Sequence, residues 1–274
     1  MSYVNFVLNS FFDLIVNPFK DIAPIWSLTL FSFLIAILML LIFRYTSNQT
    51  KIKETKSKIR AYIYELTLFK DELGIVLSAQ KNVLIQNLKY MKYAVKPMIF
   101  MIIPLGLFLI QLDSLYGHKP LDLNESTIVS LKLSDKTKMP ENISVKSDGG
   151  LTIETSPLKI VQDKQVDWRV RADEIGEHDL IFKVEDQEYQ KKVIVGNQGI
   201  MRITPTVSTP NFWNNLLYPG GKLLAKGGAV EEINVDYKRN SIDVYKWKLD
   251  WLVVIFGLSI VFAFGMKGLF KVEI

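Results

Sequence analysis

The chain has 274 residues, of which 49% are hydrophobic, and a formal net charge of +5 at pH 7. This composition leaves two classes, a soluble protein with a large core or a membrane protein with soluble parts. The chain has no cysteine, which excludes disulfide bonds and thiolate sites.

The first segment, 1–24, contains the aromatic-rich stretch YVNFVLNSFFDLIVNPF. Its pattern predicts a short helix that lies in the headgroup region of a membrane and ends at Asn17 and Pro18. Packing against another subunit is the alternative interpretation of the same apolar side chains.

Three segments are free of charged residues for about the length that a bilayer demands, namely 25–43, 97–112 and 251–266. The first has 19 residues and the other two have 16 each, against roughly 20 for a helix that crosses the hydrocarbon. A single short segment of this kind is also compatible with a buried core helix, but three in one chain predict a membrane protein. The first span starts too far into the chain and lacks the basic residues of a signal peptide, so we expect it to be retained.

Basic residues set the predicted orientation. The segment 44–96 carries eleven Lys and Arg residues against four acidic residues, which places it in the cytoplasm by the positive-inside rule. The N-terminus and residues 113–250 are then outside, and the tail 267–274 is inside.

The cytoplasmic segment 44–96 has helical periodicity in two series. Ile52, Ile59, Leu66 and Leu73 recur every seven residues, and a second series consists of Leu77, Leu84, Leu88, Met91 and Val95. Gly74 lies between them as a helix terminator. The pattern predicts an antiparallel coiled-coil hairpin, and a single long helix on the membrane surface is the alternative.

The basic face of this hairpin consists of Lys51, Lys53, Lys56, Lys58, Arg60, Lys81, Lys89 and Lys92. These residues suit contacts with ribosomal RNA or anionic lipid headgroups, although solubilising the hairpin is the simpler interpretation.

Two prolines follow the hairpin in the sequence. Pro97, at the entry into the second span, is predicted to act as a hinge, and Pro104 to kink the span.

Residues 113–210 change character to short alternating runs separated by turn signals, which predicts an immunoglobulin-like (Ig-like) β-sandwich outside the membrane. Trp168 is its expected core aromatic residue, and IGEHDLIFKVEDQEYQKKVIVG its last hairpin. Residues 211–250 are predicted to form a second interfacial helix, around FWNNLLY, and a connector.

Residues that carry catalytic chemistry are scarce. His118 and His178 are the only histidines, no glycine-rich loop resembles a phosphate cradle, and the acidic residues 185–188 suit a solvated turn. We therefore expect no enzyme activity, no metal site and no cofactor.

Three local motifs, in this order along the chain, resemble the Oxa/YidC/Get insertase superfamily. NSFFDLIVNPF at 9–19 is similar to its N-terminal amphipathic stretch, FRYTSNQTKIKETKSKIR at 43–60 to its exit from the first span, and MKYAVKPMIFMIIPL at 91–105 to its entry into the second. Among members, the chain most resembles small archaeal YidC-like proteins and their relatives in the endoplasmic reticulum membrane complex. It departs from them in the long segment between the second and third spans and in lacking a clear counterpart of the basic groove residue of some bacterial members.

The resemblance implies a membrane protein insertase or insertion chaperone that offers its clients a thinned, partly hydrated groove. It implies a client-contacting or groove role for a set of residues in and near the spans: Arg44, Met91, Met98, Met101, Pro104 and Gln111. The implied partners are membrane lipids and nascent or client membrane proteins, together with a ribosome, a translocon or other membrane-complex subunits.

The combined prediction is an α+β membrane protein with three transmembrane helices, a cytoplasmic coiled-coil hairpin and an extracytoplasmic Ig-like β-sandwich. We expect it in a prokaryotic plasma (inner) membrane. The alternative function is that of a non-catalytic structural subunit of a larger membrane complex, docked through its β-domain.

Overall fold

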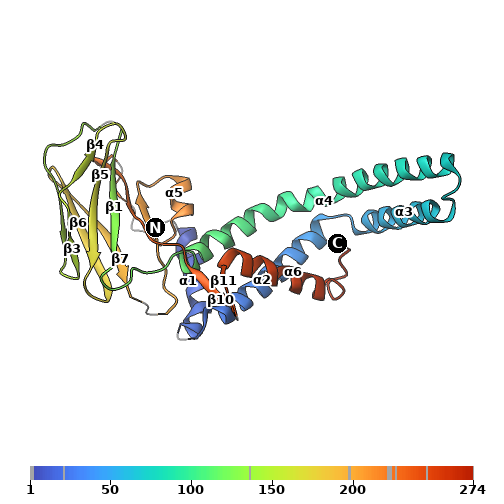
Figure 1. Ribbon diagram of the computed structural model, residues 1–274, viewed down its shortest axis with the longest axis horizontal. Coiled ribbons are helices and arrows are strands. Elements are labelled where there is room, and N and C mark those ends of the chain that lie inside the picture. Colours follow the sequence, from blue (N-terminus) through green and yellow to red (C-terminus); the bar gives the residue numbers. More distant parts are fainter. Residues whose placement is uncertain are drawn as a thin grey trace. The chain divides into compact units, whose positions relative to one another are not determined.

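The structure is a computed structural model that describes residues 3–20, 22–135, 137–196, 199–220, 224–225, 227–244 and 246–273. The side chains of residues 3, 4, 212, 213 and 215 lie outside this description. The chain divides into two compact units (Figure 1). We call Met1–Ser27 with Leu109–Trp251 the β unit, and Leu28–Phe108 with Leu252–Ile274 the helical unit, and describe each by itself.

The mixture of helix and sheet that the sequence predicts is confirmed. The helices are α1 (Tyr3–Val16), the short 3₁₀ helix η1 (Asn17–Phe19), α2 (Pro24–Thr46), α3 (Gln49–Leu68), α4 (Leu73–Tyr116), α5 (Phe212–Leu217) and α6 (Trp251–Met266). The strands are β1 (Ser126–Leu133), β2 (Ile143–Ser147), β3 (Leu151–Ile153), β4 (Leu158–Ile160), β5 (Gln165–Ala172), β6 (Gly176–Val184), β7 (Gln187–Val195), β8 (Thr206–Ser208), β9 (Val230–Val235), β10 (Ser241–Val244) and β11 (Trp247–Asp250).

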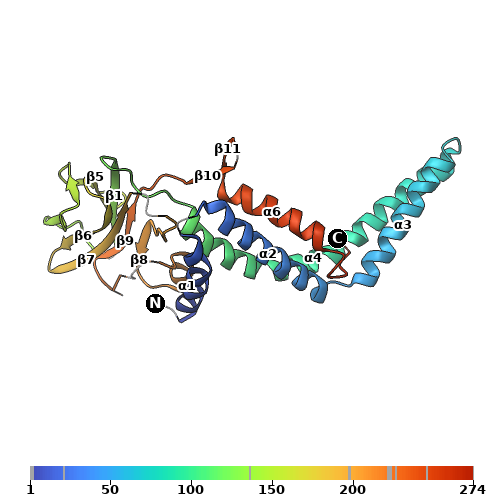
Figure 2. The same ribbon diagram turned by 90° about the horizontal axis from the view of Figure 1, so that it is seen from below.

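Within the described residues, two helices are long and apolar enough to cross a membrane, α2 with 23 residues and α4 with 44. The third apolar helix, α6, has 16 residues, which is fewer than the roughly 20 that a helix needs to cross the hydrocarbon. α6 lies against α2 in both views (Figures 1 and 2). The Ser259 hydroxyl donates to the Ser32 carbonyl at 3.3 Å, and the rings of Phe33 and Phe262 meet edge to face at 5.5 Å.

In the apolar segments of these helices the outward side chains are apolar. In α4 they include Ile99, Phe100 and Ile103, and in α6 Val253, Ile260, Val261 and Phe264. Exposed apolar surface on this scale is unusual in a soluble monomer and is expected of helices that face lipid.

The helical hairpin consists of α3 and the first half of α4, which run side by side in both views (Figures 1 and 2). α3 ends at Leu68, and α4 begins at Leu73, where the Glu72 carbonyl accepts the amides of Ile75 and Val76. Gly74 therefore lies in the first turn of α4, and its predicted role as a terminator was wrong. The acidic residues before α4 suit a helix N-terminus, where the backbone amides favour negative charge.

The predicted seam of the hairpin is confirmed in part on α3 and corrected on α4. On α3, Ile52 is buried and Ile59 and Leu66 are half-buried. In the hairpin half of α4 the buried positions are Ala79, Gln86 and Pro97, and the apolar series Leu77, Leu84, Leu88, Met91 and Val95 is exposed instead. The period of seven was a sound indication of a common face, but on α4 a different face is the buried one.

The β unit contains two antiparallel sheets around one hydrophobic core. One sheet has the strand order β3-β5-β1-β9-β8, with β4 also paired to β5, and the other has the order β2-β6-β7. Both sheets contribute to the same core, in which Trp168 of β5 is 2% exposed and meets Phe182 of β6 at 5.5 Å. The prediction of Trp168 as a core residue is confirmed.

The predicted last hairpin corresponds to β6 and β7, which pair from Gly176↔Val195 to Val184↔Gln187. The turn between them contains Glu185 at φ 55°, in the left-handed region. The sheet does not end at residue 210, because β9 pairs with both β1 and β8. The β-domain thus takes a central strand from the segment that was assigned to the connector.

Helix α1 exposes large apolar side chains. Its exposed residues include Phe6, Val7, Phe11 and Leu14 beside the polar Ser10 and Asp13, whereas Asn5 and Asn9 are buried together with Phe12 and Val16. The Asn9 amide donates to the Pro219 carbonyl at 2.6 Å. The other predicted interfacial helix contains α5, but its Phe212 and Trp213 side chains lie outside the described residues.

Candidate functional site

The most extended feature of the helical unit is an apolar stripe along one face of α4. It consists of Leu77, Leu84, Leu88, Met91, Val95, Met98 and Ile102, each between 47% and 67% exposed. Successive members are three, four or seven residues apart, so that they share one face of the helix. The stripe extends from the charged arm of the hairpin, where the exposed Gln80 and Lys81 interrupt it between Leu77 and Leu84, into the apolar segment that starts at Pro97.

Two of the predicted client-contacting residues, Met91 and Met98, belong to this stripe. Met101 and Pro104 are half-buried in the same helix. Arg44 is exposed at the end of α2, where its guanidinium lies 5.9 Å from the Tyr45 ring centroid.

α4 continues through Pro97 and Pro104 as one helix. Because proline lacks an amide hydrogen, each leaves the carbonyl four residues earlier, at Tyr93 and at Phe100, without the usual helical donor. Pro97 itself is buried.

The predicted basic face of the hairpin is distributed over both helices. Its exposed members are Lys51, Lys53, Lys58, Arg60, Lys81, Lys89 and Lys92, and Lys56 is half-buried. Lys51 lies 5.8 Å from the Tyr93 ring centroid and Lys56 lies 5.9 Å from that of Tyr90. These cation–π contacts connect α3 to α4, so that two of the eight basic residues have a structural role.

The Asn48-Gln49 pair, which contributes to the family resemblance, has a clear local role. The Asn48 side chain caps α3 by accepting the Lys51 amide at 3.0 Å. The Gln49 side-chain oxygen accepts the backbone amide of Glu273 at 2.7 Å, and the neighbouring Val272 is buried. The pair thus starts α3 and holds the C-terminal segment against it.

Gln111 belongs to the β unit, where it is 1% exposed. Its amide oxygen accepts from Arg202 at 2.8 Å, and the same guanidinium also bonds to the Ser114 hydroxyl at 2.5 Å and to the Asp13 carboxylate at 2.8 Å. Gln111 therefore takes part in a polar network that connects α1, α4 and the segment after β7. Sequence reasoning missed Arg202, because its partners lie far away in the chain and nothing in the local pattern marks it.

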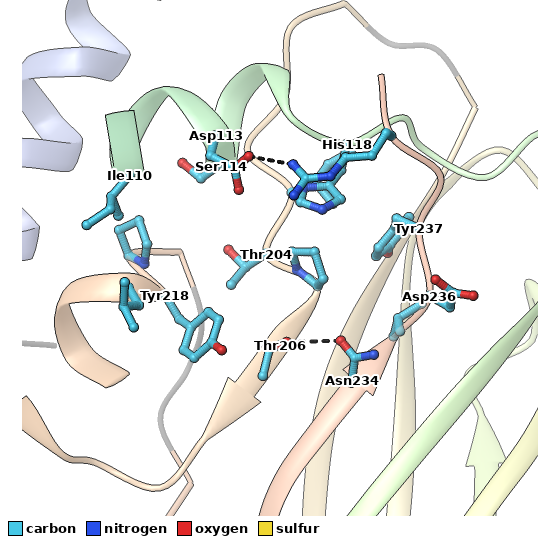
Figure 3. A pocket seen from close by; sticks show the side chains of 16 residues that line it. Ile110, Asp113, Ser114, His118, Thr204, Thr206, Tyr218, Asn234, Asp236 and Tyr237 are labelled. Atoms are coloured by element: carbon cyan, nitrogen blue, oxygen red, sulfur yellow. Dashed lines mark hydrogen bonds and ion pairs between the residues drawn. The ribbon is translucent and has the colours of Figure 1, made fainter. Parts of the chain in front are cut away.

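A cavity of ≈ 440 Å³ in the β unit is lined by residues from α4, β8 and β9 and from the segments beside them (Figure 3). Asp113 accepts from Arg239 at 2.7 Å, and the Thr206 hydroxyl donates to the Asn234 side chain at 2.9 Å. His118 is one of the residues that line this cavity. Burial lowers the pKa of its imidazole, and the nearby Asp113 carboxylate partly offsets this decrease. A neutral histidine is therefore the form present at pH 7.

The cavity is lined by polar and ionisable side chains, among them Asp113, His118 and Arg239. Among the described residues, no group of three or more His, Asp or Glu side chains is placed to hold a metal ion. Comparisons with protein-family models, curated proteins and solved structures found no match to this chain.

Proposed function

We propose that the protein is a YidC-like membrane insertase or insertion chaperone, with the apolar stripe on α4 as its client-binding surface. The observation that carries the proposal is the length of that stripe, which is unbroken from Leu84 in the charged hairpin to Ile102 in the apolar segment. A surface of this shape matches an apolar client helix on its way from the cytoplasm into lipid.

The stripe combines two kinds of side chain that suit varied clients. Its leucines supply area, and Met91 and Met98 are flexible thioethers that adapt to helices of different shape. A client that rests on this face keeps its apolar side chains out of water until lipid replaces the stripe.

The barrier that an insertase lowers is the passage of polar groups through hydrocarbon, where each unsatisfied group costs several kcal/mol. α6 has 16 residues, which at 1.5 Å per residue is about 24 Å against about 30 Å of hydrocarbon. Such a short span favours local thinning of the bilayer. The carbonyl of Phe100, four residues before Pro104, lacks its usual helical donor and adds a polar group that water in a groove would satisfy.

In this proposal α2, α4 and α6 span a plasma membrane, with the hairpin in the cytoplasm and the Ig-like β unit outside. The exposed apolar side chains of α1 support a position at the outer membrane surface. The exposed Trp247, four residues before α6, suits the same interface.

Site-specific photo-crosslinking tests the client-binding surface. A photo-reactive residue at Met91 is expected to capture nascent single-span membrane proteins, whereas one at Lys89 is not. The two positions are both exposed and two residues apart, but they lie on nearly opposite faces of α4. Equal capture at the two positions, or none at Met91, contradicts the proposal.

A second candidate function is that of a structural subunit docked through the β unit. The observation that favours it is the exposure of Leu158 and Val161, 64% and 69%, at the outer strand β4. Purification from membranes separates the two candidates. A stable stoichiometric complex unrelated to translocation favours the structural subunit, and ribosomes, translocon or nascent chains favour the insertase.

A further inference from the structure

The β unit holds a second cavity, of ≈ 380 Å³, whose lining includes a buried lysine and an arginine with 14% of its side chain exposed. They are Lys191 of β7 and Arg202, and Thr204 and Gly220 lie beside them. We infer that this cavity is an oxyanion site for a phosphate group, held between the Lys191 ammonium and the Arg202 guanidinium.

Lys191 points into the domain rather than toward water and is 2% exposed. Its ammonium donates to the Thr204 carbonyl at 2.5 Å, which is the one hydrogen bond that it makes within the described residues. The next residue, Lys192, points outward and pairs with Glu177 at 2.5 Å. The alternation of the strand thus buries Lys191 and leaves Lys192 exposed, although Lys192 also borders the cavity.

Arg202 brings the second set of donors. Its terminal nitrogens bond to Gln111, Ser114 and Asp13, which fixes the guanidinium in place. Its Nε is buried and has no partner among the described residues. A buried N–H without an acceptor is costly, and a bound oxyanion would supply that acceptor.

Among the described basic residues that line the cavity, Lys191 is the one without an acidic partner, because Arg202 is paired with Asp13 at 2.8 Å. Glu177 is paired with Lys192 at the surface, and Asp179 is the other acidic residue in the lining. Burial lowers the pKa of Lys191 to about 7, as expected of an ammonium group without a buried counterion. An oxyanion in the cavity would supply that counterion, and charge-assisted bonds to lysine and arginine are the strongest that phosphate makes in proteins.

Free phosphate and the headgroup of an anionic phospholipid share this chemistry. The headgroup is a credible source because Arg202 is bonded to Asp13 of α1, the helix that exposes large apolar side chains. The experiment below distinguishes the two sources.

The test uses the full chain in a non-ionic detergent. Its thermal unfolding is measured against increasing inorganic phosphate, with chloride at matched ionic strength, and in nanodiscs of phosphatidylglycerol or of phosphatidylcholine. A ligand that binds only the folded state raises the melting temperature with concentration. A rise with phosphate supports a free-phosphate site, and a rise with phosphatidylglycerol alone supports a headgroup site.

Lys191→Met keeps most of the side-chain volume and removes the ammonium, and Lys183→Met removes the same charge from an exposed position of β6 outside the cavity lining. We expect Lys191→Met to weaken half-saturation by about 10-fold or more, as for the loss of one charge-assisted bond, and Lys183→Met to leave it unchanged. The inference is overturned if neither phosphate nor phosphatidylglycerol stabilises the protein, or if both variants respond alike.

Discussion

Lys191 is the residue whose ionisation most directly affects stability. Its pKa is about 7 in the folded chain, against an ordinary value of 10.5. Between these two values the unfolded chain binds more protons, so stability rises with pH from about 7 to about 10.5. Below pH 7 the cost of burying the ammonium is present in full.

Lys191→Met removes this cost. In phosphate-free buffer we expect it to raise the free energy of unfolding by about 3 to 5 kcal/mol at pH 6 and by much less at pH 10. Urea unfolding of the full chain, followed by tryptophan fluorescence at both pH values, measures the difference. A gain that does not depend on pH would show that packing rather than charge is responsible.

Asn48 permits a second prediction for a single side chain. Asn48→Ala removes the acceptor for the Lys51 amide and is expected to destabilise the start of α3 by about 1 kcal/mol. Hydrogen exchange of the first-turn amides of α3 measures this as faster exchange. Asn48→Asp keeps an acceptor oxygen and should exchange like the parent protein, and equal exchange in all three proteins would rule out the cap.

Among the elements, α4 has two faces that a labelling experiment can tell apart. The chain has no cysteine, so a single substitution creates a unique label site. Leu88→Cys on the apolar stripe is expected to react rapidly with a water-soluble maleimide, and Ala79→Cys, which is fully buried, at least about 10-fold more slowly. The reverse order would mean that the series at Leu77, Leu84 and Met91 faces α3 after all.

This element also shows what sequence patterns can and cannot predict. Periodicity correctly grouped Leu77, Leu84 and Met91 on one face of α4, because the helical repeat determines which residues share a face. It does not determine which neighbour that face meets. The small or polar Ala79 and Gln86 are buried instead, and an apolar face left exposed cannot be recognised without the partner helix.

The β unit gives a similar result. Alternation predicted β1, β5, β6 and β7 and the buried Trp168, since the side-chain period of a strand is visible in the sequence. The pairing of β9 with β1, and the contacts of Arg202 with Asp13 and Gln111, join residues far apart in the chain. Such contacts depend on topology, which local sequence patterns do not contain.

At the scale of the whole molecule, the proposed insertase function requires two properties of the helical unit together. Its apolar helices suit a membrane, and the stripe on α4 suits a client that has not yet entered it. A structural anchor needs the first property and not the second, because exposed apolar surface on a hairpin in water is a liability without a partner. The decisive measurement therefore has to separate anchoring from client transfer.

That measurement is the insertion of a single-span client with a short translocated tail into proteoliposomes that contain the purified full chain. We predict that insertion exceeds that of empty liposomes and falls to the empty-liposome level with the combined variant Leu84→Gln, Leu88→Gln and Met91→Gln. A matched variant at exposed polar positions of α4, Gln80→Asn, Asn87→Gln and Lys89→Gln, should retain insertion. Insertion no greater than in empty liposomes, or equal loss in the two variants, would contradict the insertase assignment.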